Sequence, residues 1–222
     1  MRPEKTTTQL RRLCLRATRF TAASGSAVSL MSASGPSGVV AASGDHSRKI
    51  AELQFSLGEG PCWDVFDSNA EVLAHDLDSG PGDRWVAWTA AATSYGVHAA
   101  FAFPLQVGPT QLGVLDVYRL SPGALGDGML ADVRGLAEAA TQVLLDGQER
   151  AGEGATPAGV DAALEAGLEI YQAQGMVMIQ LAVPLADAMS RLRAYAYAND
   201  RSLSEVARDI VARTLTLERD ER

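Results

Sequence analysis

Residues 171–211 read YQAQGMVMIQLAVPLADAMSRLRAYAYANDRSLSEVARDIV, a pattern that predicts three short helices. Val183 ends the first helix, because a residue that precedes proline is driven out of the α region. Pro184 suits the first turn of the next helix, where a missing N–H costs nothing. Residues 202–205 (SLSE) form a capping box, which predicts the start of the third helix. Three such helices bury little alone, so we expect an output module on a larger body.

The second and third helices each carry an apolar stripe at the three- and four-residue spacing of one helix face. The second stripe consists of Leu185, Ala188, Met189, Leu192 and Ala196, and the third of Leu203, Val206, Ile210 and Leu217.

Over about residues 161–215 the order and spacing resemble the ANTAR domain, the three-helix RNA-binding output of bacterial transcription antiterminators. The family usually has lysine where Gln174 stands, and asparagine and lysine where Asp200 and Ser202 stand. The residues that carry the resemblance are Ala173-Gln174-Gly175, Met176, Met178, Ala188, Leu192-Arg193, Ala196, Arg201, Leu203 and Val206-Ala207.

This resemblance implies an RNA-binding face built from small, aromatic and arginine side chains. Arginine suits phosphates and splayed bases through its flat fork of donors, and tyrosine suits base stacking. The alternative for the arginines is pairing with Asp187, Glu205 or Asp209. The residues expected to bind RNA are Ala173, Gln174, Gly175, Arg191, Arg193, Tyr197, Arg201 and Arg208.

Charge argues for a second reading of the module. The chain carries 19 Lys and Arg against 27 Asp and Glu, a formal net charge of −8, and residues 161–222 hold 7 basic and 10 acidic residues. A nucleic-acid binder usually presents a basic stripe, so RNA contact here would depend on a local arginine patch. The alternative is a ligand-sensing protein whose C-terminal helices dock a protein partner.

Upstream, short strands arrive as hairpins between helices, which predicts an α+β fold around an antiparallel sheet. We expect one domain over residues 1–150, a linker at 151–159 (AGEGATPAG) and a helical domain over 160–222. The expected helices are 9–23, 49–57, 85–94 and 129–145, with another starting at 62–66; the expected strands are 27–32, 38–43, 71–75, 99–107 and 113–118.

Residues 9–146 resemble a GAF domain, a small-molecule sensing fold that is known to precede ANTAR domains. The most specific match is the LGEGP motif at 57–61. The matching residues are Gln54, Leu57-Gly58-Glu59-Gly60-Pro61-Cys62, Asp76-Leu77, Trp85, Gly96-Val97, Phe103-Pro104-Leu105, Leu112-Gly113, Leu115-Asp116 and Tyr118.

In such folds an apolar pocket lies between the sheet and its covering helices. The candidate ligand-binding residues are Cys62, Trp63, Trp85, Trp88, Phe101 and Phe103. For Cys62 and Trp63 the alternative is a tight turn that leads from one helix into the next, and for the other four it is plain core packing. The 58–63 turn lacks the third glycine of a dinucleotide loop. Glu59 stands where a papain-like protease has its second cysteine. We therefore expect no enzyme, no metal site and no cofactor.

The two cysteines, Cys14 and Cys62, form no disulfide framework, and no apolar run approaches the roughly 18 residues of a membrane span. Arginines interrupt the N-terminal apolar residues, so we expect a cytoplasmic protein without a signal peptide. Helices 129–145 and 160–181 form a candidate stalk for a homodimer, with four apolar residues near one side of the second: Leu164, Leu168, Tyr171 and Met178. The resulting prediction is a signal-responsive regulator that binds antiterminator hairpins in nascent RNA.

Overall fold

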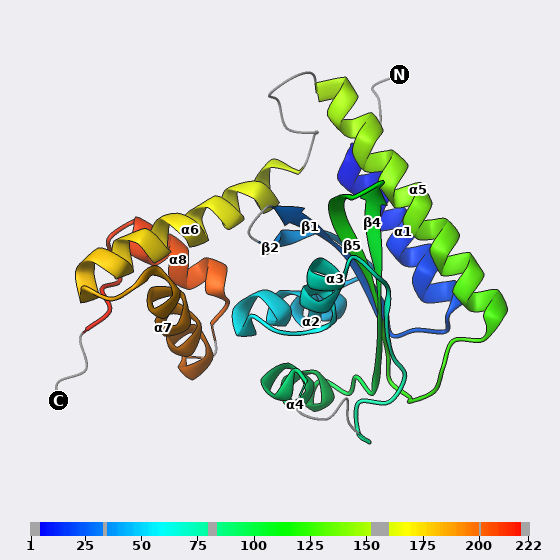
Figure 1. The fold of residues 1–222 in the computed structure, drawn as a ribbon, viewed down its shortest axis with the longest axis horizontal. Coiled ribbons are helices and arrows are strands. Elements are labelled where there is room, and N and C mark those ends of the chain that lie inside the picture. Colours follow the sequence, from blue (N-terminus) through cyan, green and yellow to red (C-terminus); the bar gives the residue numbers. More distant parts are fainter. Residues whose placement is uncertain (1–4, 33–34, 80–83, 152–159, 200, 219–222) are drawn as a thin grey trace.

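The computed structural model describes residues 5–32, 35–79, 84–151, 160–199 and 201–218. Two parts of the chain lie side by side (Figure 1): an α+β domain up to residue 151 and a three-helix domain from residue 160. The predicted fold class is confirmed. The predicted linker lies outside the described residues, except for Ala151 at the end of a helix. None of the helices described is long and apolar enough to cross a membrane.

The α+β domain is built on one five-stranded antiparallel sheet with strand order β2-β1-β5-β4-β3. The hairpin β4–β5 turns at Gly108, whose φ of 56° is left-handed and suits glycine. The strands are β1 (Gly25–Ser32), β2 (Gly35–Ala42), β3 (Val72–Ala74), β4 (Ala99–Val107) and β5 (Thr110–Arg119).

Helices cover both faces of this sheet (Figure 1). Helices α1 (Thr6–Phe20) and α5 (Asp127–Ala151) lie on one face, and α2 (Asp45–Leu57), α3 (Pro61–Ser68) and α4 (Val86–Ser94) lie on the other. The predicted stalk at 129–145 is therefore part of a core, because the apolar side of α5 packs on α1 and the sheet. The buried residues of α5 in that core are Val133, Leu136, Ala137, Ala140 and Leu144.

The C-terminal domain consists of α6 (Asp161–Leu181), α7 (Leu185–Ala198) and α8 (Leu203–Val211). Both predicted apolar stripes pack in its core, except that Leu185 is 51% exposed. Pro184 is the residue before α7 rather than a member of its first turn. The capping box is confirmed: the Ser202 hydroxyl accepts from the Glu205 N–H at 3.2 Å, and the Glu205 carboxylate accepts from the Ser202 N–H at 2.9 Å.

The two domains touch where α6 crosses the edge strand β2. A Cβ on Gly167 would lie 2.7 Å from the carbonyl oxygen of Ser37, so only glycine permits this approach. An uncovered edge strand presents unpaired backbone groups, and α6 covers this one. The contact places α7 and α8 beside α2.

Candidate functional site

The core between the sheet and helices α2 to α4 is aromatic. Trp85 and Trp88 pack edge to face, with ring centres 5.9 Å apart. Trp88 and Tyr118 are both fully buried there. The carboxylate of Glu59, from the predicted 58–63 turn, accepts a hydrogen bond from the Trp88 backbone N–H at 2.7 Å. This core occupies the position expected for a ligand pocket.

A hydrogen-bond network runs through the same core and centres on Gln54. The Gln54 side-chain amide donates to the Tyr118 hydroxyl at 3.2 Å, and its oxygen accepts from the Cys62 N–H at 2.7 Å. The Gln54 backbone carbonyl accepts from the indole N–H of Trp63 at 2.8 Å. One residue of α2 thereby ties together β5 and the first turn of α3.

Asp116 is the exceptional group of this core. Its side chain is fully buried, and neither carboxyl oxygen makes a hydrogen bond of ordinary geometry with the described atoms, although the Gln54 amide and the Tyr118 hydroxyl lie near it. Burial raises the pKa of Asp116 to about 7, although nearby Gln54 and Tyr118 oppose the shift. The Ser29 hydroxyl and the Trp88 indole N–H are also buried without hydrogen-bond partners in the described part of the chain, and both lie on the same side of the sheet. Orphan polar atoms in one core mark a candidate binding site.

The predicted ligand-binding residues do not all meet in this core. Cys62 packs beside it on the same side of the sheet, and burial raises its pKa, which keeps the sulfur a thiol. Phe101 and Phe103 instead point to the opposite face, against α1 and α5. Alternation along β4 predicts that the two phenylalanines share a face but does not say which one.

Trp63 also lies outside this core. Its ring contacts β2 closely enough that a Cβ on Gly35 would meet it at 2.7 Å. Three residues that the structure brings into the site were not among the predicted ones: Gln54, Asp116 and Tyr118. An aspartate within the apolar run Leu115-Asp116-Val117 is the signal by which sequence alone marks this group.

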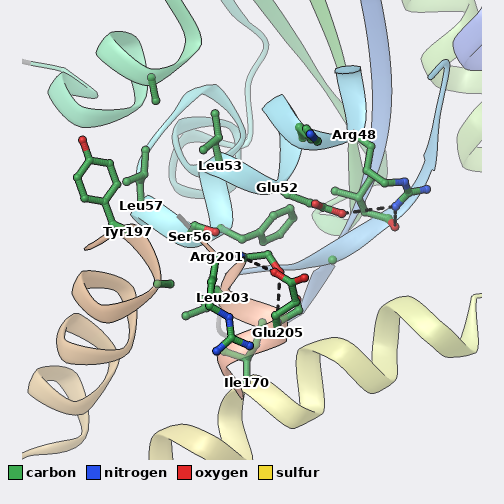
Figure 2. Close-up of a pocket in the computed structure, with 18 of the residues that line it drawn as sticks. Arg48, Glu52, Leu53, Ser56, Leu57, Ile170, Tyr197, Arg201, Leu203 and Glu205 are labelled. Carbon is green, nitrogen blue, oxygen red and sulfur yellow. Dashed lines mark hydrogen bonds and ion pairs between the residues drawn. The ribbon is translucent and has the colours of Figure 1, made fainter. Parts of the chain in front are cut away.

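A cleft of about 1380 Å³ separates the two domains. Figure 2 shows α2 on one side, with Glu52, Ser56 and Leu57, and the three-helix domain on the other. Arg48 and Glu52 pair at 3.8 Å. Burial raises the pKa of Glu52; Arg48 opposes this effect and Glu205, across the cleft, adds to it. The cleft therefore holds charges of both signs.

Three of the predicted RNA-binding residues line this cleft. Tyr197 is 70% exposed at the end of α7 and lies beside Leu57 (Figure 2). Arg201 pairs with Asp209 at 2.6 Å, and Arg208 lies 3.7 Å from Glu169. Both pairs are partly exposed, so exchange of their carboxylates for phosphate costs little.

Arg193 is placed differently, against the α+β domain. Its guanidinium carbon lies over the Trp63 ring, 5.7 Å from the centre. A Cβ on Gly58 would overlap this guanidinium. The side chain is half-buried, and its Nε has no hydrogen-bond partner among the residues described. Burial lowers the pKa of Arg193.

The other predicted RNA-binding residues lie apart from the cleft. Ala173 and Gln174 are buried, and the Gln174 amide donates to the Leu185 carbonyl at 2.8 Å, joining α6 to α7. Gly175 is half-buried with open space where a Cβ would stand. Arg191 lines a separate hollow with Tyr195 and Glu218.

Comparison with known proteins assigns both parts of the chain. Residues 6–145 match the family model of the GAF domain, and residues 158–211 match that of the ANTAR domain. No curated protein matches the chain at a significant level.

Solved structures match the α+β domain. A GAF domain from a Coxiella burnetii phosphoenolpyruvate-protein phosphotransferase superposes with a TM-score of 0.53 at 15% identity, over 67% of this chain and 88% of its own. A Synechocystis GAF domain in its photoproduct state superposes with a TM-score of 0.53 at 11% identity, over 66% of this chain and 97% of its own. The cyanobacteriochrome TePixJ GAF domain superposes with a TM-score of 0.52 at 14% identity, over 65% of this chain and 92% of its own. At these identities the likeness concerns the fold alone.

Proposed function

The chain belongs to the GAF domain family and carries an ANTAR domain after the GAF domain, and from this premise we propose that it regulates transcription by antitermination in response to a signal. ANTAR domains are RNA-binding antitermination modules, and GAF domains sense ligands. In this proposal the three-helix domain binds paired hairpins of nascent RNA and prevents a terminator from forming. The α+β domain acts in the cytoplasm as a sensor, without catalysis.

The observation that carries the proposal is the gathering of Tyr197, Arg201 and Arg208 at one cleft. An exposed tyrosine beside two arginines offers stacking and phosphate contacts within one surface. Each arginine is held by one partly exposed carboxylate, at Asp209 and Glu169. RNA phosphates can replace these carboxylates as partners of the two arginines, so RNA contact depends on this local arginine patch within an acidic domain.

The sensing site we propose is the core around Trp88, Tyr118 and Asp116. A small ligand with both an apolar body and polar groups would match the apolar walls of this core and the Asp116 carboxyl and Trp88 indole N–H, which lack hydrogen-bond partners among the described residues, and it would have to displace side chains that fill the core. A ligand changes the output only if it binds two conformations of the protein with different affinity.

Titration of the purified chain with a paired hexaloop-hairpin RNA tests the output. We expect binding that weakens as salt rises, because phosphate contacts release counterions. Arg201→Ala and Arg208→Ala should each weaken RNA binding. Each should also reduce the slope of log affinity against log salt concentration by about one, because one phosphate contact is lost. Arg213→Ala, at an exposed arginine outside the cleft, is the matched control.

Protein docking is the second candidate function, and exposed apolar residues of α6 favour it. Leu168 and Ile179 are 69% and 76% exposed. If RNA binding is absent with and without candidate ligands, and changes at these two residues abolish capture of a defined partner, the docking function replaces the RNA function.

A further inference from the structure

The contact between Arg193 and Trp63 joins the two domains through a side chain predicted to bind RNA. Arginine can stack on an aromatic ring, but a buried cation normally needs an anionic partner as well. Within the described chain no carboxylate pairs with Arg193, and its Nε donor is unsatisfied. The guanidinium is therefore poorly compensated in this position and would gain hydrogen bonds from a phosphate.

The α+β domain supplies a seat shaped for this guanidinium. Gly58 ends α2 in the left-handed region, with φ of 72°, and any side chain there would overlap Arg193. The Trp63 indole that faces Arg193 is fixed by its N–H bond to the Gln54 carbonyl. Gly58 caps the C-terminus of α2, and Trp63 lies in the first turn of α3, just after the short connection between these helices.

This seat is connected directly to the proposed sensing core. Gln54, which holds Trp63 through its carbonyl, holds Tyr118 and the N-terminus of α3 through its side chain. A ligand that displaces Gln54 or Tyr118 must therefore move the turn on which Arg193 rests. Because packed interfaces respond to small shifts by switching between arrangements, such a displacement can undock α7.

We propose that the seat formed by Gly58 and Trp63 is an autoinhibitory latch, in which the α+β domain and RNA compete for the Arg193 guanidinium. In the latched arrangement α7 is held against α2 and α3, with Arg193 half-buried on Trp63 and with Tyr197 and Arg201 lining the interdomain cleft. The signal frees the helix by moving the turn at residues 58–63. This regulation rests on the proposed RNA-binding function.

Gly58→Asn is the sharpest test, because asparagine tolerates the left-handed conformation at a helix end while its side chain expels Arg193. It leaves both Arg193 and Trp63 intact. Gly108→Asn is the matched control: Gly108 is also left-handed, with φ of 56°, but has open space around a Cβ. Circular dichroism establishes that each full-length variant is folded.

We expect Gly58→Asn to bind the hexaloop-hairpin RNA about tenfold tighter or more than the parent, since the apparent affinity scales with the fraction of competent molecules. Gly108→Asn binds like the parent. Adding Arg193→Ala to Gly58→Asn removes the gain. Unchanged or weaker binding by folded Gly58→Asn overturns the latch.

Hydrogen exchange without RNA separates failure of the latch from failure of the proposed function. A latch predicts faster exchange of α3 and α7 amides in Gly58→Asn than in Gly108→Asn. If no variant binds RNA, the proposed function fails while this comparison still decides the latch. Equal amide exchange in the two variants overturns the latch, whether or not the variants bind RNA.

Discussion

Gln54 and Tyr118 meet inside the α+β domain, with the amide of Gln54 donating to the Tyr118 hydroxyl at 3.2 Å and both side chains fully buried. The Gln54 oxygen simultaneously accepts from the Cys62 N–H. One amide therefore satisfies a buried hydroxyl and a buried backbone donor in the first turn of α3. Low local dielectric makes such networks rigid when they are complete and costly when they are broken.

Gln54→Met is expected to destabilise the α+β domain by about 2–4 kcal/mol, because methionine fills the space but leaves the Tyr118 hydroxyl and the Cys62 N–H unpaired. Urea unfolding followed by tryptophan fluorescence measures the change, since all three tryptophans lie in this domain. Gln172→Met, at an exposed position of α6, is the control and should leave the transition unchanged. A loss below about 0.5 kcal/mol in Gln54→Met would show that the network contributes little.

Asp116 makes the stability of the α+β domain depend on pH. Its pKa rises from 3.8 to about 7 on burial, so the folded state keeps a proton that the unfolded state has lost. Stability must then fall as pH increases from about 4 to about 7 and level off above that. Between pH 5 and pH 8 this group alone lowers the free energy of unfolding by about 3 kcal/mol, two pH units at about 1.4 kcal/mol each.

Asp116→Asn should remove this slope and make the domain more stable than the parent at pH 8. The change in stability between pH 5 and pH 8 is measured by the urea midpoints of three proteins: the parent, Asp116→Asn and the exposed control Asp67→Asn. The control should keep the slope of the parent. Equal slopes in all three proteins would mean that Asp116 is ionised in the folded state.

Local patterns made most elements of this fold predictable from sequence. The capping box at Ser202 and the stripes of α7 and α8 depend only on residues three or four apart, so they are visible without a structure. Turns, alternation and the LGEGP motif likewise located the sheet and its helices. Boundaries moved by a few residues because helix ends depend on tertiary contacts.

The candidate site was less predictable because it depends on long-range packing. Nothing near Arg193 in the sequence indicates that Trp63 and Gly58 receive it. The period-2 pattern of β4 could not choose a face for Phe101 and Phe103, since helices cover both sides of the sheet. The sequence offered Asp187, Glu205 and Asp209 as partners for the arginines, but which arginine pairs with which carboxylate follows from the path of the chain between α7 and α8, which joins Arg201 to Asp209.

Ser202→Ala should weaken the start of α8 by about 1 kcal/mol, because the hydroxyl accepts one of the unpaired N–H groups at the helix N-terminus. Hydrogen exchange of the α8 amides measures this loss locally. Ser190→Ala is the matched control, since Ser190 is exposed within α7 and alanine favours a helix interior. Equal changes in the two variants would contradict a capping role for Ser202.

Homodimer formation remains a prediction, and the structure indicates which face of α6 to test. Leu168 and Ile179 are 69% and 76% exposed and lie eleven residues apart, about three helical turns, so they share a face with Tyr171 between them. Met178, predicted to lie on that side, packs instead against the core of the three-helix domain. Exposed apolar residues in one row favour contact with a second copy.

Light scattering at micromolar concentration should give two chain masses for the parent and one for Leu168→Glu combined with Ile179→Glu, because the two carboxylates would be buried in the contact. Changing the exposed Val86 and Leu120 of the α+β domain to Glu controls for a general loss of surface apolarity and should leave the dimer intact. A parent protein of one chain mass would exclude the dimer. A parent dimer that survives the α6 changes would place its interface elsewhere.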